Sequence, residues 1–339
     1  MNKEIRFGII GCGVIAPTHA KAIENTEGAV LMGACSHSFE KARAFAEEYH
    51  CRAYETYDAM LESPEIDAVS ICSPTGNHFE HARRAILAGK HVVVEKPMCL
   101  TLAEADTLIA LSKAHGRSLC VISQSRFSAA AQAIRKMIES GVAGRPVSTQ
   151  LMMRFFRGDA YYSSAAWRGT FAYDGGGVLM NQGIHGIDLL CYLMGKPVSV
   201  AGFVRTRLRN IEVEDTAAAA IAFESGAVGV IDATVCSEPS FTKKFILAFE
   251  KGTVILENDV ITLWSVPGEC PDCTVSLAGN TSADNTKVSA SYHTVEYGNF
   301  IRHLRDNEPL VVDGAEGRMP LGVILGIYES SKTGRRVDL

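Results

Sequence analysis

The segment IRFGIIGCGVIA, residues 5–16, decides the fold class of this chain. A short apolar run leads directly into the pattern G-x-G-x-x-A, formed by Gly11, Gly13 and Ala16. Between a strand and a helix, the first glycine permits a tight turn, the second lets backbone approach a pyrophosphate, and the small third residue lets the helix pack closely. The pattern predicts a βαβ unit that holds a dinucleotide at the helix N-terminus. The residues expected to contact it are Gly11, Cys12, Gly13, Val14 and Ile15.

Strand-like and helix-like segments continue to alternate up to residue 123. Strands are expected at 30–35, 68–72, 91–94 and 118–123, and helices at 17–24, 39–49, 79–88 and 102–114. Strands separated by helices of about 10 to 15 residues imply a parallel sheet with both faces covered. Residues 1–123 are therefore predicted to form an α/β Rossmann domain with a doubly wound parallel sheet.

The pattern changes after residue 124. A helix at 129–139 is followed by longer runs rich in Val, Thr, Phe and Arg. Strands are expected at 147–156, 198–208, 217–223, 227–234, 244–250 and 253–256, and helices at 184–193 and 318–331. Gly226 supplies a hairpin turn between two of these strands. Residues 124–339 are predicted to form an α+β domain with a large, mostly antiparallel open sheet, and the last helix could pack back on the first domain.

Composition limits the partners and the compartment. The chain has 339 residues, 47% of them hydrophobic, and a net charge of −5, which fits two domains and offers no broad positive field for nucleic acid. No segment reads as a signal peptide or reaches the roughly 20 apolar residues of a membrane helix. Ten cysteines are scattered, mostly in apolar segments, which favours the reducing cytoplasm. The one close pair, Cys270 and Cys273, is expected to be two loop thiols, because a structural metal site needs four ligands.

The end of the second expected strand bears on the choice of cofactor. Residues 35–40 read CSHSFE, so the first acid is Glu40, whereas an NAD site usually has a carboxylate at the strand end that bonds the adenosine ribose. Ser36 and His37, with Lys41 one turn away, offer hydroxyl and cationic donors that suit a ribose 2′-phosphate. The segment favours NADP. The alternative is an NAD site in which Ser36 bonds the ribose.

A second strand end carries charge. Residues 92–97 read VVVEKP, and ligands of doubly wound sheets bind beyond the carboxyl ends of the strands. A partly desolvated Lys96 near a nicotinamide ring could exchange a proton with a substrate hydroxyl. Pro97 would fix the backbone direction, and a cis bond is one way to do so. The alternative is a surface lysine that pairs with Glu95. Further cofactor contacts are expected at Ser73, Pro74, Asn77, His78, Glu95 and Lys96.

A third motif, GGGVLMNQGIHGID at residues 175–188, lies in the second half. Its glycines free the backbone for close approach. Asn181, His185 and Asp188 are spaced by four and three residues, so they could share one face of a helix. Polar groups on a buried face are costly unless they are paired, which favours a functional role over a core histidine at His185.

These three motifs together resemble the Gfo/Idh/MocA family, and the likeness extends to the terminal stretch IYESSKTGRRV. The resemblance implies an NAD(P)-dependent oxidoreductase acting on a secondary hydroxyl or ketone of a sugar, polyol or sugar derivative. It places the catalytic lysine of the family at Lys96 and its histidine at His185. Many members carry aspartate where this chain has Asn181, which can orient a hydroxyl but cannot carry a proton, so the proton role shifts to Lys96 and His185.

The resemblance also suggests substrate residues. Asp188 would bind substrate or steady the site, and Arg126 follows the first domain as in other members. Aromatic and basic residues before the third motif could line a sugar pocket or serve ordinary packing. The predicted substrate residues are Asn181, Asp188, Arg126, Tyr162, Trp167 and Arg168. No metal is required for this chemistry.

Other functions within the family remain possible from the sequence. One is a catalytically silent regulatory protein that binds nucleotide and sugar, and another is a nucleotide-sugar dehydrogenase that keeps and recycles its cofactor. The expected open face of the second sheet suggests a homodimer or homotetramer.

Overall fold

The structure is a computed structural model that describes residues 4–271 and 290–339. Cys273, and with it the expectation for the Cys270–Cys273 pair, lies outside the described residues. The chain divides into two compact units, Met1–Gln124 with Val288–Arg318 and Ser125–Lys287 with Met319–Leu339. In the part of the chain that is described, no helix is long and apolar enough to cross a membrane.

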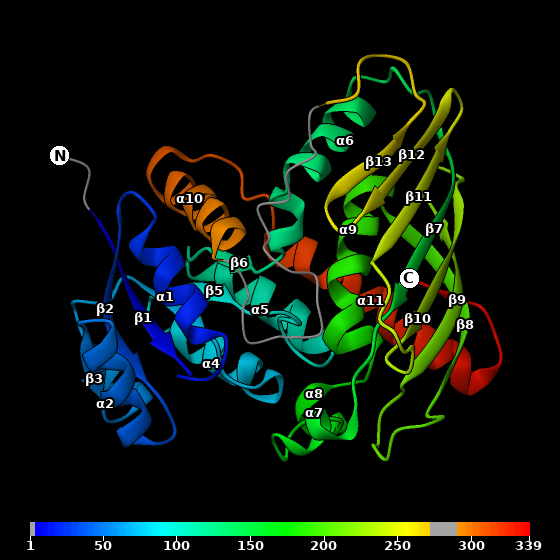
Figure 1. The fold of residues 1–339 in the computed structure, drawn as a ribbon. Helices are drawn as coiled ribbons and strands as arrows, with labels where there is room; N and C mark the ends of the chain where they lie inside the picture. The colour runs from blue at the N-terminus through cyan, green and yellow to red at the C-terminus, as the bar shows by residue number, and fades with distance from the viewer. Residues whose placement is uncertain (1–3, 272–289) are drawn as a thin grey trace. The chain divides into compact units, whose positions relative to one another are not determined.

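The first unit contains a six-stranded parallel sheet in the order β3-β2-β1-β4-β5-β6 (Figure 1). Its strands are β1 (Ile5–Ile10), β2 (Ala29–Cys35), β3 (Arg52–Tyr54), β4 (Ala68–Ile71), β5 (His91–Val94) and β6 (Leu119–Val121). This order reverses direction between β1 and β4, where doubly wound sheets bind their ligands. The predicted Rossmann fold is confirmed.

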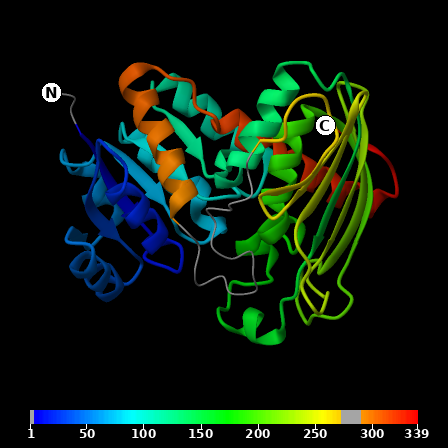
Figure 2. The same cartoon turned by 45° about the horizontal axis from the view of Figure 1, so that its top comes forward.

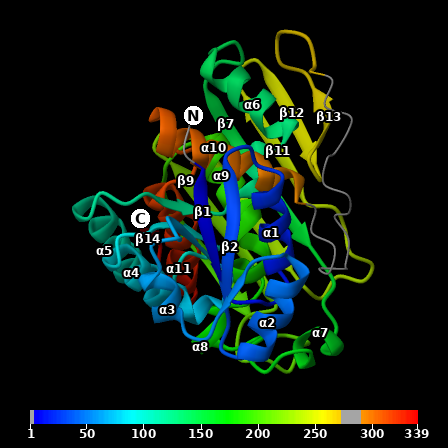
Figure 3. The same cartoon turned by 90° about the vertical axis from the view of Figure 1, so that its left-hand side faces the viewer.

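Helices cover both faces of this sheet. They are α1 (Ala16–Glu24), α2 (Phe39–Glu48), α3 (Tyr57–Glu62), α4 (His78–Leu87), α5 (Leu102–Ala114) and α10 (Ser291–Asp306). Figure 3 shows α1 and α2 on one side of β1 and β2, and α4 and α5 on the other. Helix α10 packs on α1 and brings Tyr297 and Phe300 into the core, where the Tyr297 ring centroid lies 5.4 Å from that of Phe7. Neither α10, α3 nor β3 is predicted from the sequence.

The second unit contains an eight-stranded sheet in the order β13-β12-β11-β7-β10-β9-β8-β14. Its strands are β7 (Pro146–Arg154), β8 (Pro197–Arg205), β9 (Thr216–Phe223), β10 (Val228–Thr234), β11 (Lys244–Phe249), β12 (Gly252–Glu257), β13 (Val260–Trp264) and β14 (Val337–Asp338). Among the strands of the described residues in this sheet, only β7 and β10 pair in parallel, so the predicted mostly antiparallel sheet is confirmed. The predicted hairpin turn between β9 and β10 contains Gly226 at a φ of 87°.

Helices pack on one face of this second sheet, and β9 and β10 alternate buried and exposed residues accordingly. The helices of this unit are α6 (Ala129–Glu139), α7 (Asp159–Ser163), α8 (Phe171–Asp174), α9 (Ile184–Met194) and most of α11 (Gly314–Thr333). In Figure 2 the green helices α6 and α9 lie on the same side of the strands, and α9 contacts β7.

A π-helical turn, Leu179–Gly183, precedes α9, and within it the Gly183 N–H donates to the Val178 carbonyl five residues earlier, at 2.7 Å. Asn181 lies in this wider turn, so its four-residue spacing to His185 does not follow regular α-helical geometry. Such turns are frequent at functional sites.

Candidate active site

The glycine turn after β1 leaves room for a ligand. Gly11 has a φ of 96°, and a Cβ there would lie 2.6 Å from the Ser73 amide nitrogen. A Cβ on Gly13 would meet nothing within 4 Å. Helix α1 has no side-chain cap and no acid in its first turn, so the positive end of its dipole faces the turn. Pro17 has no N–H, and the Ala16 and Thr18 N–H groups donate to the Gly13 and Ile15 carbonyls at 3.2 and 3.0 Å. The turn therefore fits the phosphates of a dinucleotide.

The end of β2 carries the residues expected at the ribose. Ser36 is buried and His37 is exposed. Ser38 caps helix α2 by accepting from the Lys41 N–H at 3.4 Å, and its hydroxyl donates to a Glu40 carboxylate oxygen at 2.8 Å. The nearest acid after β2 is thus bonded within the start of α2.

His78 joins the loops that follow β4 and β5. Its imidazole is buried, with Nδ1 2.7 Å from the Pro97 carbonyl oxygen and Nε2 2.8 Å from the Ser73 carbonyl oxygen. Burial lowers the pKa of His78, and the two carbonyl groups oppose that change. The Lys96–Pro97 peptide bond is cis. The two loops expected to contact the cofactor are therefore tied together beside Lys96.

Glu95 points into the first unit and not to the surface. One carboxylate oxygen lies 2.9 Å from His19 Nε2, and the other accepts from the Lys96 N–H at 3.1 Å. His19 Nδ1 lies 2.8 Å from the Tyr297 hydroxyl, which also bonds the Ser70 hydroxyl. Glu95 is thus a buried carboxylate that bonds both His19 and the backbone of Lys96.

The pKa directions assign protons within this cluster. Burial acts to raise the pKa of Glu95, but the neighbouring His19 and His293 outweigh it and hold that pKa well below its ordinary value. Burial lowers the pKa of His19. A neutral His19 therefore donates from Nε2 to an ionised Glu95 and accepts at Nδ1 from Tyr297.

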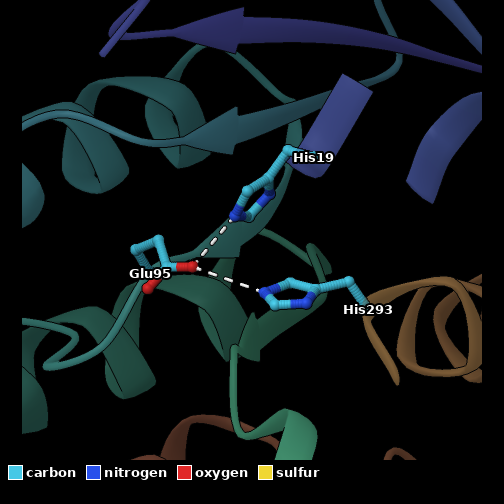
Figure 4. A group of neighbouring side chains, drawn as sticks. All are labelled: His19, Glu95 and His293. Carbon is cyan, nitrogen blue, oxygen red and sulfur yellow. Dashed lines mark hydrogen bonds and ion pairs between the residues drawn. The ribbon is translucent and has the colours of Figure 1, made fainter. Parts of the chain in front are cut away.

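The same cluster contains three side chains of the types that bind metal ions, His19, Glu95 and His293. Figure 4 shows His19 and His293 both directed at the Glu95 carboxylate, with His293 Nε2 3.8 Å from it. Ligand atoms of these three residues lie within 4.8 Å of one another. His19 and Glu95 bond each other through their facing atoms, whereas neither ring nitrogen of the buried His293 has a hydrogen-bond partner among the described residues.

In the second unit, Gly177 packs against Glu214, and its neighbour Gly176 packs against the Tyr328 hydroxyl. A Cβ on Gly177 would lie 1.7 Å from the Glu214 carbonyl oxygen. The Glu214 carboxylate accepts from the N–H groups of Gly177 and Leu179 at 2.7 and 2.9 Å, and from the Tyr328 hydroxyl at 2.9 Å. Burial raises the pKa of Glu214. The close approach that Gly177 permits is thus to the backbone of the chain itself.

Asn181 is bonded to Asp174, a residue without a role in the sequence-based predictions. Its side-chain Nδ2 donates to one Asp174 oxygen at 3.0 Å, and the Gly169 N–H donates to the other at 2.6 Å. Asp174 comes directly before the glycines, which is the signal that could have identified it.

Tyr161 connects further predicted residues. Its hydroxyl accepts from Arg168 at 2.6 Å and from the Gln182 amide at 3.2 Å. The Arg168 guanidinium lies 4.3 Å from the centroid of the Tyr161 ring and 4.5 Å from that of Trp167, and Tyr162 packs edge-on against Tyr161. Tyr162 and Arg168 are therefore direct neighbours of Tyr161, and Trp167 contacts Arg168. Asn181 is linked to this group only through its sequence neighbour Gln182.

Arg126 and Asp188 bond to each other. Arg126 Nε and NH2 donate to the two Asp188 oxygens at 2.9 and 2.7 Å, and both side chains are buried. The guanidinium also lies 4.9 Å from the centroid of the Tyr192 ring. His185, one turn before Asp188 on α9, is partly exposed. The pair anchors the segment after β6 to α9.

The Rossmann unit with its open glycine turn, and a second unit with a polar cluster before α9, define a two-domain dinucleotide-binding oxidoreductase. Residues 5–123 match the family described as an oxidoreductase family with an NAD-binding Rossmann fold, and residues 131–255 match the GFO/IDH/MocA C-terminal domain. The chain belongs to the Gfo/Idh/MocA family.

Similar proteins match most or nearly all of this chain. It is 26% identical to the myo-inositol 2-dehydrogenase of Thermotoga maritima, over 99% of this chain and 98% of the relative. It is 31% identical to the dTDP-3,4-didehydro-2,6-dideoxy-alpha-D-glucose 3-reductase of Streptomyces violaceoruber, over 76% and 73%. The WlbA dehydrogenase of Bordetella pertussis, solved with NADH and UDP-GlcNAcA, superposes with a TM-score of 0.89 and 32% identity, over 99% of each chain.

Proposed function

We propose that this protein transfers a hydride between a nicotinamide cofactor and a secondary hydroxyl or ketone of a sugar, polyol or sugar derivative. The observation that carries the proposal is Lys96, next to the buried Glu95 on a loop that His78 ties to the turn after β4. The inositol, dTDP-sugar and UDP-sugar in the names of similar proteins support this range of substrates.

Each residue then has a defined task. The nicotinamide, when bound, accepts or supplies the hydride at C4. Lys96 exchanges the proton of the substrate hydroxyl, and His185 assists or takes over. Asn181 holds a hydroxyl, and Tyr162, Trp167 and Arg168 line the sugar pocket. We assign Arg126 and Asp188 to bracing, because each already satisfies the other in a bidentate pair.

Of the two nicotinamide cofactors, we propose that the protein prefers NADP(H) to NAD(H). The absence of a carboxylate at Ser36 or His37, with Lys41 close in sequence, supports it, and Gly13 leaves space for the pyrophosphate. A fluorescence titration is expected to give tighter binding for NADPH than for NADH. Much tighter binding of NADH would contradict this choice and leave the NAD alternative.

The central test replaces Lys96 by Met. Turnover is expected to fall by about 100-fold or more, the usual contribution of a positioned acid or base, while NAD(P)H binding is kept. Substrates are screened by absorbance at 340 nm with myo-inositol, D-glucose and UDP-GlcNAcA and both cofactors. The matched control is Lys113→Met, at an exposed position on α5. Unchanged turnover in Lys96→Met would remove the catalytic assignment, and intact cofactor binding without turnover of any sugar would favour the regulatory alternative.

We also propose a homodimer or homotetramer formed through the open face of the second sheet. Exposed side chains on neighbouring strands support this, with Phe203 64% and Val230 46% exposed. On β9, which lies between their strands, Ala218 is paired with Phe203 and Ala220 with Val230, and both alanines are exposed as well. A contiguous apolar face of this kind marks an interaction site. The scattered cysteines support a cytoplasmic setting.

A further inference from the structure

His293 is a buried histidine without a hydrogen bond. It lies near the start of α10 and is 1% exposed, and neither of its ring nitrogens has a hydrogen-bond partner among the described residues. Its Nε2 lies 3.8 Å from a Glu95 carboxylate oxygen, which is beyond hydrogen-bond distance. A buried polar group left unpaired is destabilising, so folded proteins nearly always supply it with a partner.

The Glu95 oxygen that His293 faces is the same one that bonds His19. His19 Nε2 lies 2.9 Å from it, and the ligand atoms of the three residues lie within 4.8 Å of one another. A tetrahedral zinc ion, with bonds of about 2.0–2.1 Å, holds its ligand atoms about 3.3 Å apart. That spacing lies between the 2.9 and 3.8 Å that separate the Glu95 oxygen from the two imidazoles. Small side-chain movements would therefore bring the three atoms onto one ion.

The groups behind two of these ligands are already in place. His19 Nδ1 lies 2.8 Å from the Tyr297 hydroxyl, which also bonds the Ser70 hydroxyl, and the second Glu95 oxygen accepts from the Lys96 N–H at 3.1 Å. A metal-binding histidine usually donates its other N–H to such a partner, which fixes the ring and its tautomer. With an ion at Nε2, the His19 proton moves to Nδ1 and is donated to the Tyr297 oxygen.

We propose that His19, Glu95 and His293 form a binding site for a divalent transition-metal ion, and specifically for Zn²⁺. Two imidazoles and a carboxylate are a ligand set of zinc, whereas Mg²⁺ and Ca²⁺ prefer oxygen ligands. The ion gives the buried His293 a partner and offsets the negative charge of Glu95. A water molecule completes the tetrahedron.

The role of the ion is structural. His19 lies on α1, Glu95 directly follows β5, and His293 lies on α10, which packs on α1 (Figure 4). One ion therefore ties α10 to a helix and a strand end of the Rossmann sheet. The proposal goes beyond the proposed hydride transfer, which needs no metal. Because the three side chains are buried, the ion is taken up as α10 docks during folding.

The test counts the zinc that the whole protein acquires while it folds. The chain is produced in medium with added Zn²⁺ and in zinc-depleted medium, dialysed against metal-free buffer, and analysed by inductively coupled plasma mass spectrometry. The sample from zinc-containing medium is expected to keep about one zinc per chain and to have the higher melting temperature, because an ion that binds only the folded state stabilises it.

His293→Phe removes one ligand and keeps an aromatic ring beside His19, whose ring centroid lies 5.4 Å away. Its zinc affinity, measured by competition with chelators, is expected to fall by about 100-fold or more, because loss of a supporting hydrogen bond alone costs 10- to 100-fold. The zinc-dependent rise in melting temperature should disappear with it. The control, His115→Gln at an exposed position, should keep both.

Two results would overturn the proposal: an unmodified protein that keeps less than about a tenth of one zinc per chain, or a His293→Phe variant that keeps as much zinc as the unmodified protein. The second result would place the ion elsewhere, for example at the exposed Cys270. A further readout needs no variant. Unmodified protein produced with Co²⁺ should show the visible absorption of a tetrahedral site without a thiolate charge-transfer band, and a thiolate band would also contradict the assignment. None of these measurements depends on turnover of a sugar.

Discussion

Glu95 shows how a single buried charge can organise a loop. A carboxylate removed from water is strongly destabilising unless donors surround it. His19 and the Lys96 N–H supply donors here, and His293 lies close by. Leaving a buried polar group without its hydrogen-bond partner typically costs about 1–3 kcal/mol, and more when the group is charged, so these bonds hold the loop in one geometry. The side chain of Lys96 thereby starts from a fixed backbone position.

The cluster makes stability depend on pH. Because burial lowers the pKa of His19, the unfolded chain binds a proton below about pH 6.5 that the folded chain does not, so stability falls as pH falls through that range. His19→Gln removes this contribution. Its free energy of unfolding in urea is expected to change less between pH 7.5 and 5.5 than that of the unmodified protein, by up to about 1.4 kcal/mol per pH unit. The control, His115→Gln at an exposed position, should keep the original slope; an equal slope in His19→Gln would contradict the assignment.

At the scale of elements, two glycine-rich turns that look alike in sequence differ in what they approach. The turn before α1 leaves open space at Gly13, whereas the turn after α8 presses Gly177 against the Glu214 backbone. The first arrangement leaves room for a ligand, and the second serves packing. A sequence motif cannot distinguish a glycine that leaves room for a ligand from one that packs against backbone, because both positions require a residue without a Cβ.

Alanine substitutions are expected to separate the two turns. Gly177→Ala places a methyl group into the Glu214 carbonyl and should destabilise the protein by about 3 kcal/mol or more. Gly13→Ala meets no neighbour, so its stability should change by less than about 0.5 kcal/mol. It should weaken NAD(P)H binding by about tenfold, since the backbone must approach the pyrophosphate there. Thermal unfolding and fluorescence titration measure both, and a stable Gly177→Ala would contradict the packing role.

Most regular elements follow from periodicity, and the exceptions have physical reasons. Helix α10 is missed because its buried face carries His293, Glu296 and Asn299, which interrupt the apolar repeat. The Arg126–Asp188 pair joins residues 62 positions apart, which no local pattern connects. The four-residue spacing of Asn181 and His185 suggested one regular helical face, but the π turn intervenes. Residue types at the site are thus readable from sequence, while their partners are not.

At the scale of the whole molecule, the open face of the second sheet is the feature that bears on assembly. Val228 and Val230 project from β10 and Phe203 from β8. Single exposed apolar residues are common on protein surfaces, but exposed apolar residues on neighbouring strands of one sheet face form a patch.

A charge placed in this patch tests the proposed assembly. Val230→Glu is expected to convert the assembly to monomers of 36.6 kDa, since burying an unpaired carboxylate costs several kcal/mol. Light scattering after size-exclusion chromatography measures the mass. Val295→Glu, on the exposed side of α10, is the matched control and should keep the assembly. A monomeric unmodified protein, or an unaltered Val230→Glu assembly, would refute the interface.

Helix α10 joins the first unit although nearly the whole second unit precedes it in the chain. On the ribosome, residues 1–124 emerge long before Tyr297 and Phe300 are translated, and until then Phe7 and its neighbours lack part of their hydrophobic cover. Domains otherwise tend to mature in the order of synthesis. The hydrophobic core of the first unit is therefore complete only after residues 125–287 of the second unit have been made.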